Sequence, residues 1–130
     1  MQVILIAATA LHVLPAVAWA GYSFALARTA AANVERLFVP QMGAACVAVL
    51  TGGWLWSLTH AGAFATPERV LAIGALASVA ALAIQAISTA PIIRRLRDDP
   101  ELRRRAAVGQ RIAAGLLGIA IVCMASARHV

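Results

Sequence analysis

Three histidines are the side chains of this sequence best suited to chemistry. His12 interrupts an apolar run, His60 ends another, and His129 is the second residue from the C-terminus. An imidazole can bind a metal ion, ligate haem iron or transfer a proton. Each histidine also has a structural alternative, which is a hydrogen bond across a helix bundle.

Motifs of soluble enzymes are absent from the sequence. It has no glycine-rich phosphate loop, no CxxC pair, no HExxH and no lysine. The five acidic residues lie in predicted links or at helix ends, so no carboxylate pair is expected for acid–base catalysis. The remaining groups suited to chemistry are histidine, arginine and glutamine.

The composition predicts a membrane protein. Of the 130 residues, 62% are hydrophobic and only 12% are charged, against roughly 25% charged in soluble proteins. Four apolar runs are near or above the ~17 residues that a helix needs to cross a bilayer. They cover residues 3–27, 42–58, 70–87 and 112–127. Lipid excludes unpaired backbone groups, so these runs predict an all-α fold.

The expected architecture is one transmembrane domain over residues 1–130, an integral membrane four-helix up-down bundle. Helix starts are predicted from Thr66 and Asp99 as N-caps, each followed by proline, and from Pro40 after a link over residues 29–39. The expected helices are about 2–30, 40–60, 67–96 and 100–128.

Arginines are concentrated on one side of this predicted bundle. The positive-inside rule assigns that side to the cytoplasm, which places the N- and C-termini on the non-cytoplasmic side, as in a bacterial inner membrane protein. Anionic lipid headgroups then account for the net charge of +6, and no nucleic acid partner is expected. The arginines on that side are Arg28, Arg36, Arg94, Arg95, Arg97, Arg103, Arg104 and Arg105.

The histidines are predicted to lie at two depths. His60 and His129 are each about ten residues from the centre of their runs, or roughly 15 Å. His12 is about three residues from its centre, so it lies ~10 Å deeper. His60 and His129 could therefore share one metal ion directly, whereas a site that includes His12 needs a large cofactor such as haem.

Stripes of small and polar residues predict which face of each helix lies inside the bundle. In the first helix, His12, Ala16, Trp19 and Ser23 share one face, so His12 is expected to point inward. The other stripes are Cys46, Gly53, Ser57 and His60; Gly74, Ser78, Ala81, Gln85 and Ser88; and Arg111, Gly115, Gly118, Val122, Ser126 and His129.

A second polar group is expected in the cytoplasmic half. It comprises Gln85, Gln110 and Arg111, with Ser23 and Thr89 at the same level. Three roles are open for Arg111: reaching the headgroups, pairing with Gln85, or holding an anionic group such as a haem propionate or a lipid phosphate. Trp19 could pack in the bundle or flank a porphyrin face.

Two short patterns resemble those of small haem- and copper-related membrane families. Leu11-His12 followed by Trp19-Ala20-Gly21, together with the segment TGGWLW at 51–56, resembles the membrane domain of the copper-resistance D group and the HemJ type of protoporphyrinogen oxidase. This resemblance implies that His12 is a haem or metal ligand. The HemJ type also uses a functional lysine, which this chain lacks.

Three functions follow as expectations. The first is a protein that binds b-type haem through His12, with His60 or His129 as second axial ligand, and moves electrons in the membrane. This function includes that of a membrane haem oxidoreductase with a quinone or protein partner. The second is copper or other metal transport through the three histidines. The third is a non-catalytic subunit of a larger complex, and the small-residue stripes are compatible with a homo-oligomer.

Overall fold

The structure is a computed structural model that describes residues 1–59, 62 and 65–130. These residues form helices and turns and contain no strand. The four long helices are α1 (Gln2–Arg28), α2 (Val34–Thr59), α3 (Thr66–Thr89) and α4 (Pro100–Ser126), and short 3-10 turns follow the last two at η1 (Ala90–Ile92) and η2 (Ala127–His129). Each long helix is long and apolar enough to cross a membrane, which confirms the prediction of four such helices and indicates a multi-pass membrane protein.

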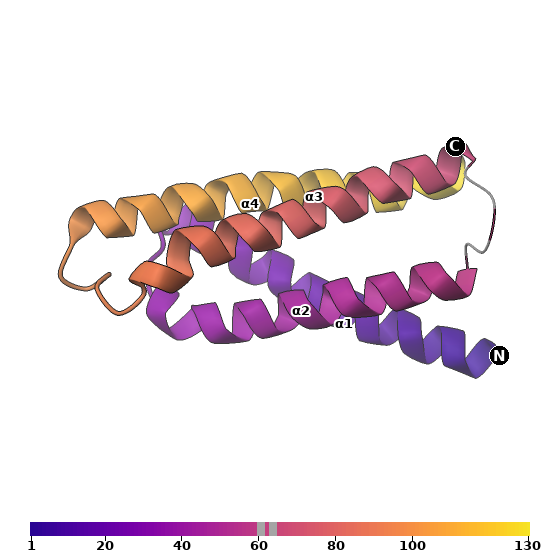
Figure 1. Cartoon of the computed structure of the whole chain (residues 1–130), viewed down its shortest axis with the longest axis horizontal. Coiled ribbons are helices and arrows are strands. Elements are labelled where there is room, and N and C mark those ends of the chain that lie inside the picture. The colour runs from indigo at the N-terminus through magenta and orange to yellow at the C-terminus, as the bar shows by residue number, and fades with distance from the viewer. Residues whose placement is uncertain (60–61, 63–64) are drawn as a thin grey trace.

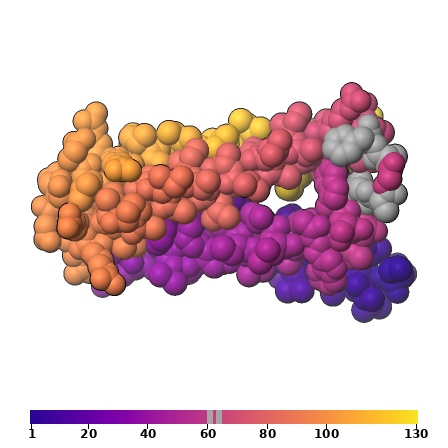
Figure 2. Space-filling model, viewed as in Figure 1, coloured from indigo at the N-terminus to yellow at the C-terminus, as the bar shows by residue number. Residues whose placement is uncertain are grey.

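The helices form two closely packed pairs, α1 with α2 and α3 with α4 (Figure 1). Contact between the pairs runs mainly through α1 and α4, whereas α2 and α3 touch much less. Both chain ends lie at one end of the molecule, and the α3–α4 link lies at the other (Figures 1 and 2).

The start of α2 differs from the prediction. It begins at Val34, and Pro40 lies inside the helix. The chain reverses in a short turn in which Ala30, Ala31 and Asn33 have positive φ angles of 50°, 61° and 60°. The turn takes up only residues 29–33, so the rest of the link expected over residues 29–39 belongs to α2. Pro40 is the seventh residue of α2, beyond the first turn, so the carbonyl of Arg36 lacks its usual backbone donor.

The other helix boundaries follow the prediction in part. Asp99 is the N-cap of α4, and its carboxylate accepts hydrogen bonds from the backbone N–H groups of Glu101 (2.9 Å) and Leu102 (3.4 Å), as expected. At α3 the N-cap is Ala65, so Thr66 is helical and not a cap. The α-helix also ends at Thr89, before the predicted residue 96, because proline at position 91 cannot donate the backbone hydrogen bond that continues it.

Burial in this protein is reversed relative to that of a soluble protein. Large aliphatic side chains face outward: Val3 is 77% exposed, Leu50 73% and Leu76 70%. The interior consists mainly of alanine, with glutamine, serine and threonine. Small interior residues and an apolar exterior are what a lipid-facing bundle requires, because its helices associate through close packing and hydrogen bonds.

The predicted inward faces are confirmed for two helices and wrong for the other two. Trp19 and Ser23 on α1 are buried, as are Gly74, Ala81 and Gln85 on α3. On α2 the predicted Cys46, Gly53 and Ser57 are exposed. On α4 so are Arg111, Gly115 and Val122, and His129 is exposed in η2. The buried residues on these two helices are Gln41, Ala45, Ala48, Gln110, Ala113, Ala114, Leu117 and Ala120.

Both errors are a rotation by one residue, or about 100° around the helix. On α2 the buried position is Ala45 and not Cys46, and on α4 it is Gln110 and not Arg111. Small residues occur all around these helices, so they do not define one face. The glutamines define the inward face, because a side-chain amide in a dry interior must find hydrogen-bond partners.

Candidate functional site

A fully buried polar cluster lies in the centre of the bundle and receives side chains from all four helices. Along each helix these polar residues lie between members of two buried apolar clusters. The side chains of the cluster, here called the amide network, belong to Trp19 and Ser23 on α1, Gln41 on α2, Gln85 on α3 and Gln110 on α4.

Gln110 is the hub of the amide network. Its Oε1 accepts a hydrogen bond from Gln41 Nε2 at 2.8 Å and another from Gln85 Nε2 at 3.1 Å. Its own Nε2 donates back to Gln41 Oε1 at 3.2 Å. One side chain thereby ties α4 to both α2 and α3.

Two residues of α1 complete the amide network. Ser23 Oγ accepts from Gln85 Nε2 at 2.8 Å and from Gln41 Nε2 at 3.1 Å, and it donates to the Trp19 carbonyl at 2.8 Å. The indole Nε1 of Trp19 donates to Gln85 Oε1 at 2.8 Å. The hydroxyl oxygen of Ser23 therefore has its donor and both acceptor positions in use.

The amide network suits a positioning role more than acid–base chemistry. None of its five side chains ionises near neutral pH. A buried polar group without a partner is costly, so the network favours the one arrangement of helices that pairs these groups. The sequence analysis does not predict Gln41 as a member of this site. The feature of the sequence that points to it is a side-chain amide immediately before the apolar run 42–58.

His12 forms a separate feature between α1 and α2. Its Nδ1 lies 2.8 Å from the carbonyl oxygen of Ala48, and the hydroxyl of Thr51 lies 3.4 Å from the same nitrogen. A carbonyl oxygen only accepts, so Nδ1 carries the proton in this bond. The neutral ring then keeps its lone pair on Nε2, the tautomer found when a backbone carbonyl orients a metal-binding histidine.

Gly52 makes this position of the imidazole accessible. A Cβ at Gly52 would lie 2.9 Å from His12 Cε1 and 3.3 Å from Nδ1, closer than carbon side chains pack. At the neighbouring Gly53, a Cβ would meet nothing within 4 Å. Thr51 therefore lies beside the imidazole ring of His12, and Gly52 leaves room for that ring.

The substitution Gly52→Ala is expected to displace the His12 ring and break its hydrogen bond to Ala48. Relative to Gly53→Ala, which gains the same helix propensity, we expect a loss of about 1 kcal/mol in the free energy of unfolding. In two-dimensional NMR of 15N-histidine-labelled protein, His12 should show a protonated Nδ1 in the wild type and an average of both tautomers in the variant. Gly53→Ala is the control and should leave the signals unchanged. An unaltered His12 signal in Gly52→Ala would contradict this account.

Among the described residues, no other histidine forms a hydrogen bond with His12. The hydrogen bonds of His12 run to α2, whereas His129 is exposed in η2. His60 lies outside the described residues. Within the described part of the chain, no three His, Cys, Asp or Glu side chains are grouped to hold a metal ion, and Cys46 and Cys123 are free thiols.

Arg111 lies on the outside of the bundle. It is exposed, and its Nε donates to the carbonyl of Ala27 at 3.4 Å. The alternative in which Arg111 pairs with Gln85 is wrong, since Gln85 bonds to other members of the amide network. Ala27 is fifteen residues beyond His12, or about 22 Å along α1.

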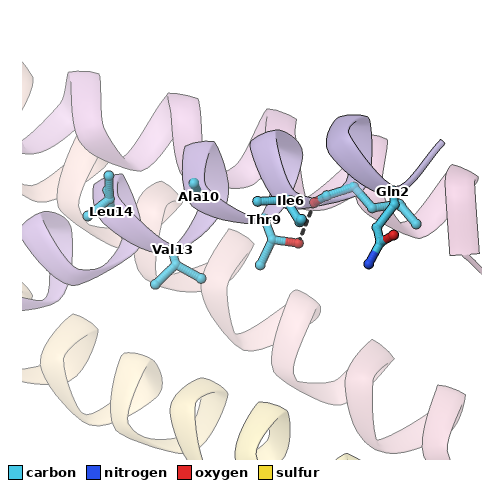
Figure 3. A pocket seen from close by; sticks show the side chains of 7 residues that line it. Gln2, Ile6, Thr9, Ala10, Val13 and Leu14 are labelled. Carbon is cyan, nitrogen blue, oxygen red and sulfur yellow. Dashed lines mark hydrogen bonds between the residues drawn. The ribbon is translucent and has the colours of Figure 1, made fainter.

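An open groove with a mainly apolar lining runs along the first half of α1 (Figure 3). Its volume is about 560 Å³. The hydroxyl of Thr9 within it already donates to the Leu5 carbonyl at 2.7 Å. The lining residues are Gln2, Leu5, Ile6, Thr9, Ala10, Val13 and Leu14.

Comparisons with protein-family models, with curated proteins and with solved structures found no match to this chain.

Proposed function

We propose that this is an integral membrane protein in which His12 is an axial ligand of a b-type haem and which takes part in electron transfer within the membrane. The observation that carries the proposal is the Nδ1 hydrogen bond of His12 to the Ala48 carbonyl, which leaves Nε2 with its lone pair. The bound haem would supply one-electron redox chemistry.

The surroundings of His12 support this proposal. Ala48 orients the ring, and Gly52 allows its close approach. The apolar groove on the same stretch of α1 is lined by the neighbouring Val13 and not by His12 itself. Haem iron accepts imidazole nitrogen, and the polarity of the surroundings tunes its potential. Either His60 or His129 is proposed as the second axial ligand.

Trp19 and Arg111 take different places in the proposal. Trp19 is two turns from His12, about 10 Å along α1, where its aromatic ring would lie between the haem and the other members of the amide network. Arg111 lies on α4 beside Ala27. Ala27 is about 22 Å along α1 from His12, so Arg111 is too far away to share a haem with His12. Its proposed partner is a lipid phosphate, with the guanidinium at the membrane surface.

We further propose an antiparallel up-down arrangement in a bacterial inner membrane, with the arginine-rich turns in the cytoplasm and both termini outside. The positive-inside rule supports this orientation. The proposed electron partner is a quinone or a redox protein.

The absorption spectrum of the protein purified in detergent tests the proposal. We expect a Soret band that shifts on reduction with dithionite and is lost in His12→Ala, because no other residue would hold the iron on α1. Separate His60→Ala and His129→Ala variants should show which one changes the spectrum as the second ligand. Haem content unchanged in His12→Ala would exclude the assignment, and a colourless protein with stoichiometric copper would favour metal transport.

A second candidate function is that of a non-catalytic subunit or homo-oligomer. Several glycines face outward, and a Cβ at Gly21, Gly43, Gly53, Gly115 or Gly118 would meet nothing within 4 Å. Outward glycines allow another helix to approach closely in lipid. A colourless, metal-free preparation that purifies with a partner chain would favour this function.

A further inference from the structure

The α1–α2 turn and the α3–α4 link lie toward the end of the molecule away from the termini (Figure 1). A small polar pocket is lined by residues of this turn, of the link and of the starts of α2 and α4. Its volume is about 330 Å³. We call it the arginine pocket, and its lining residues are Ala32, Asn33, Glu35, Arg36, Arg97 and Arg103.

Arg103 holds the arginine pocket together. Its guanidinium lies 2.8 Å from Glu35 Oε1 in a salt bridge. It also donates to the carbonyl of Ala31 in the α1–α2 turn at 3.3 Å and to the carbonyl of Leu96 in the α3–α4 link at 3.2 Å. The charge of Glu35 is therefore balanced, and Arg103 fixes the two chain segments beside each other.

Arg36 and Arg97 provide the surplus charge of the arginine pocket. Both are exposed, and neither forms an ion pair with another described residue. Three guanidinium groups and one carboxylate leave two positive charges around this small volume. Guanidinium groups recognise phosphate oxygens through paired hydrogen bonds.

We propose that the arginine pocket binds the phosphate group of an anionic ligand, either a phospholipid headgroup or a free phosphate. The pocket lies at the ends of α1 and α2, where an apolar helix meets its polar turn. That is the level at which lipid phosphates contact a membrane protein. The site is independent of haem, so failure of the proposed redox function would leave it unaffected.

Native mass spectrometry of the full chain tests this site with phosphatidylglycerol and phosphatidylcholine of the same acyl chains. We expect preferential retention of phosphatidylglycerol, and about thirtyfold weaker binding in the double variant Arg36→Gln/Arg97→Gln. The control Arg94→Gln/Arg105→Gln removes the same charge from exposed positions outside the pocket and should bind like the wild type.

A parallel titration with inorganic phosphate, followed by 31P NMR, distinguishes the two sources of the ligand. If a free phosphate is the ligand, inorganic phosphate will bind the wild type and the control but not Arg36→Gln/Arg97→Gln, with no lipid preference. If neither probe binds, or if both double variants lose binding equally, the proposed site is wrong.

Discussion

Replacement of Gln110 by leucine is expected to lower the free energy of unfolding by about 2 to 4 kcal/mol. Leucine fills a similar volume but removes both the amide oxygen and the amide nitrogen of the hub. Gln41 Oε1 then loses its donor, while Gln41 Nε2 and Gln85 Nε2 each lose one acceptor. These groups are fully buried, so water cannot replace the lost partner without opening the bundle.

Unfolding in mixed detergent and sodium dodecyl sulfate micelles, followed by circular dichroism, would measure this effect. Gln2→Leu is the matched control, because the same amide is removed from an exposed position at the start of α1. If the two variants lose the same stability, the amide network contributes nothing specific. Gln110→Leu should also increase proteolysis of the α1–α2 turn as the helices lose their common hub.

Gly109→Ala is expected to force α3 and α4 apart and to destabilise the protein by about 2 to 3 kcal/mol. A Cβ at Gly109 would lie 2.7 Å from Ser88 Cβ and still closer to Ser88 Oγ. The contact is between two helices, so the backbone must move. Ser88 is one turn from Gln85, and this movement would also disturb the amide network.

The same unfolding measurement checks this prediction, with two further variants. Gly115→Ala, also on α4, has no atom within 4 Å of the added Cβ and should be neutral or slightly stabilising. The double variant Gly109→Ala/Ser88→Gly removes the opposing side chain and should recover most of the lost stability. Equal behaviour of Gly109→Ala and Gly115→Ala would show that α3 and α4 do not pack closely at this point.

Part of the candidate site is readable from local sequence. An inward face containing Trp19 and Ser23 follows from 3.6 residues per turn, and both residues are buried. Gln85 is conspicuous because it lies inside the apolar run 70–87, and Gln110 because it lies two residues before the run 112–127. Gln41 is less conspicuous, because it follows Pro40 at a position that resembles a helix start although α2 begins at Val34.

The contacts that carry the functional proposals are mostly between residues distant in sequence. His12 meets Ala48 and Gly52 from α2, and Arg103 joins Glu35 to the α3–α4 link. Such pairings depend on helix rotation and height. Neither the rotation nor the height of a helix follows from its hydropathy pattern. A helix with small residues on several faces presents a similar hydropathy to its neighbours after it rotates by one position.

By itself, the sequence determined the four helices long and apolar enough to span a membrane, the Asp99 cap and the inward face of α1. These features depend on local properties: apolar length, backbone hydrogen bonding in lipid and capping chemistry. Only the tertiary structure decided that Gln110 and not Arg111 faces inward, that Gln41 joins the amide network, and that Gly52 receives the His12 ring. The reason is that a buried amide or a close ring contact is satisfied by a partner on another helix, and that partner exists only once the helices have packed.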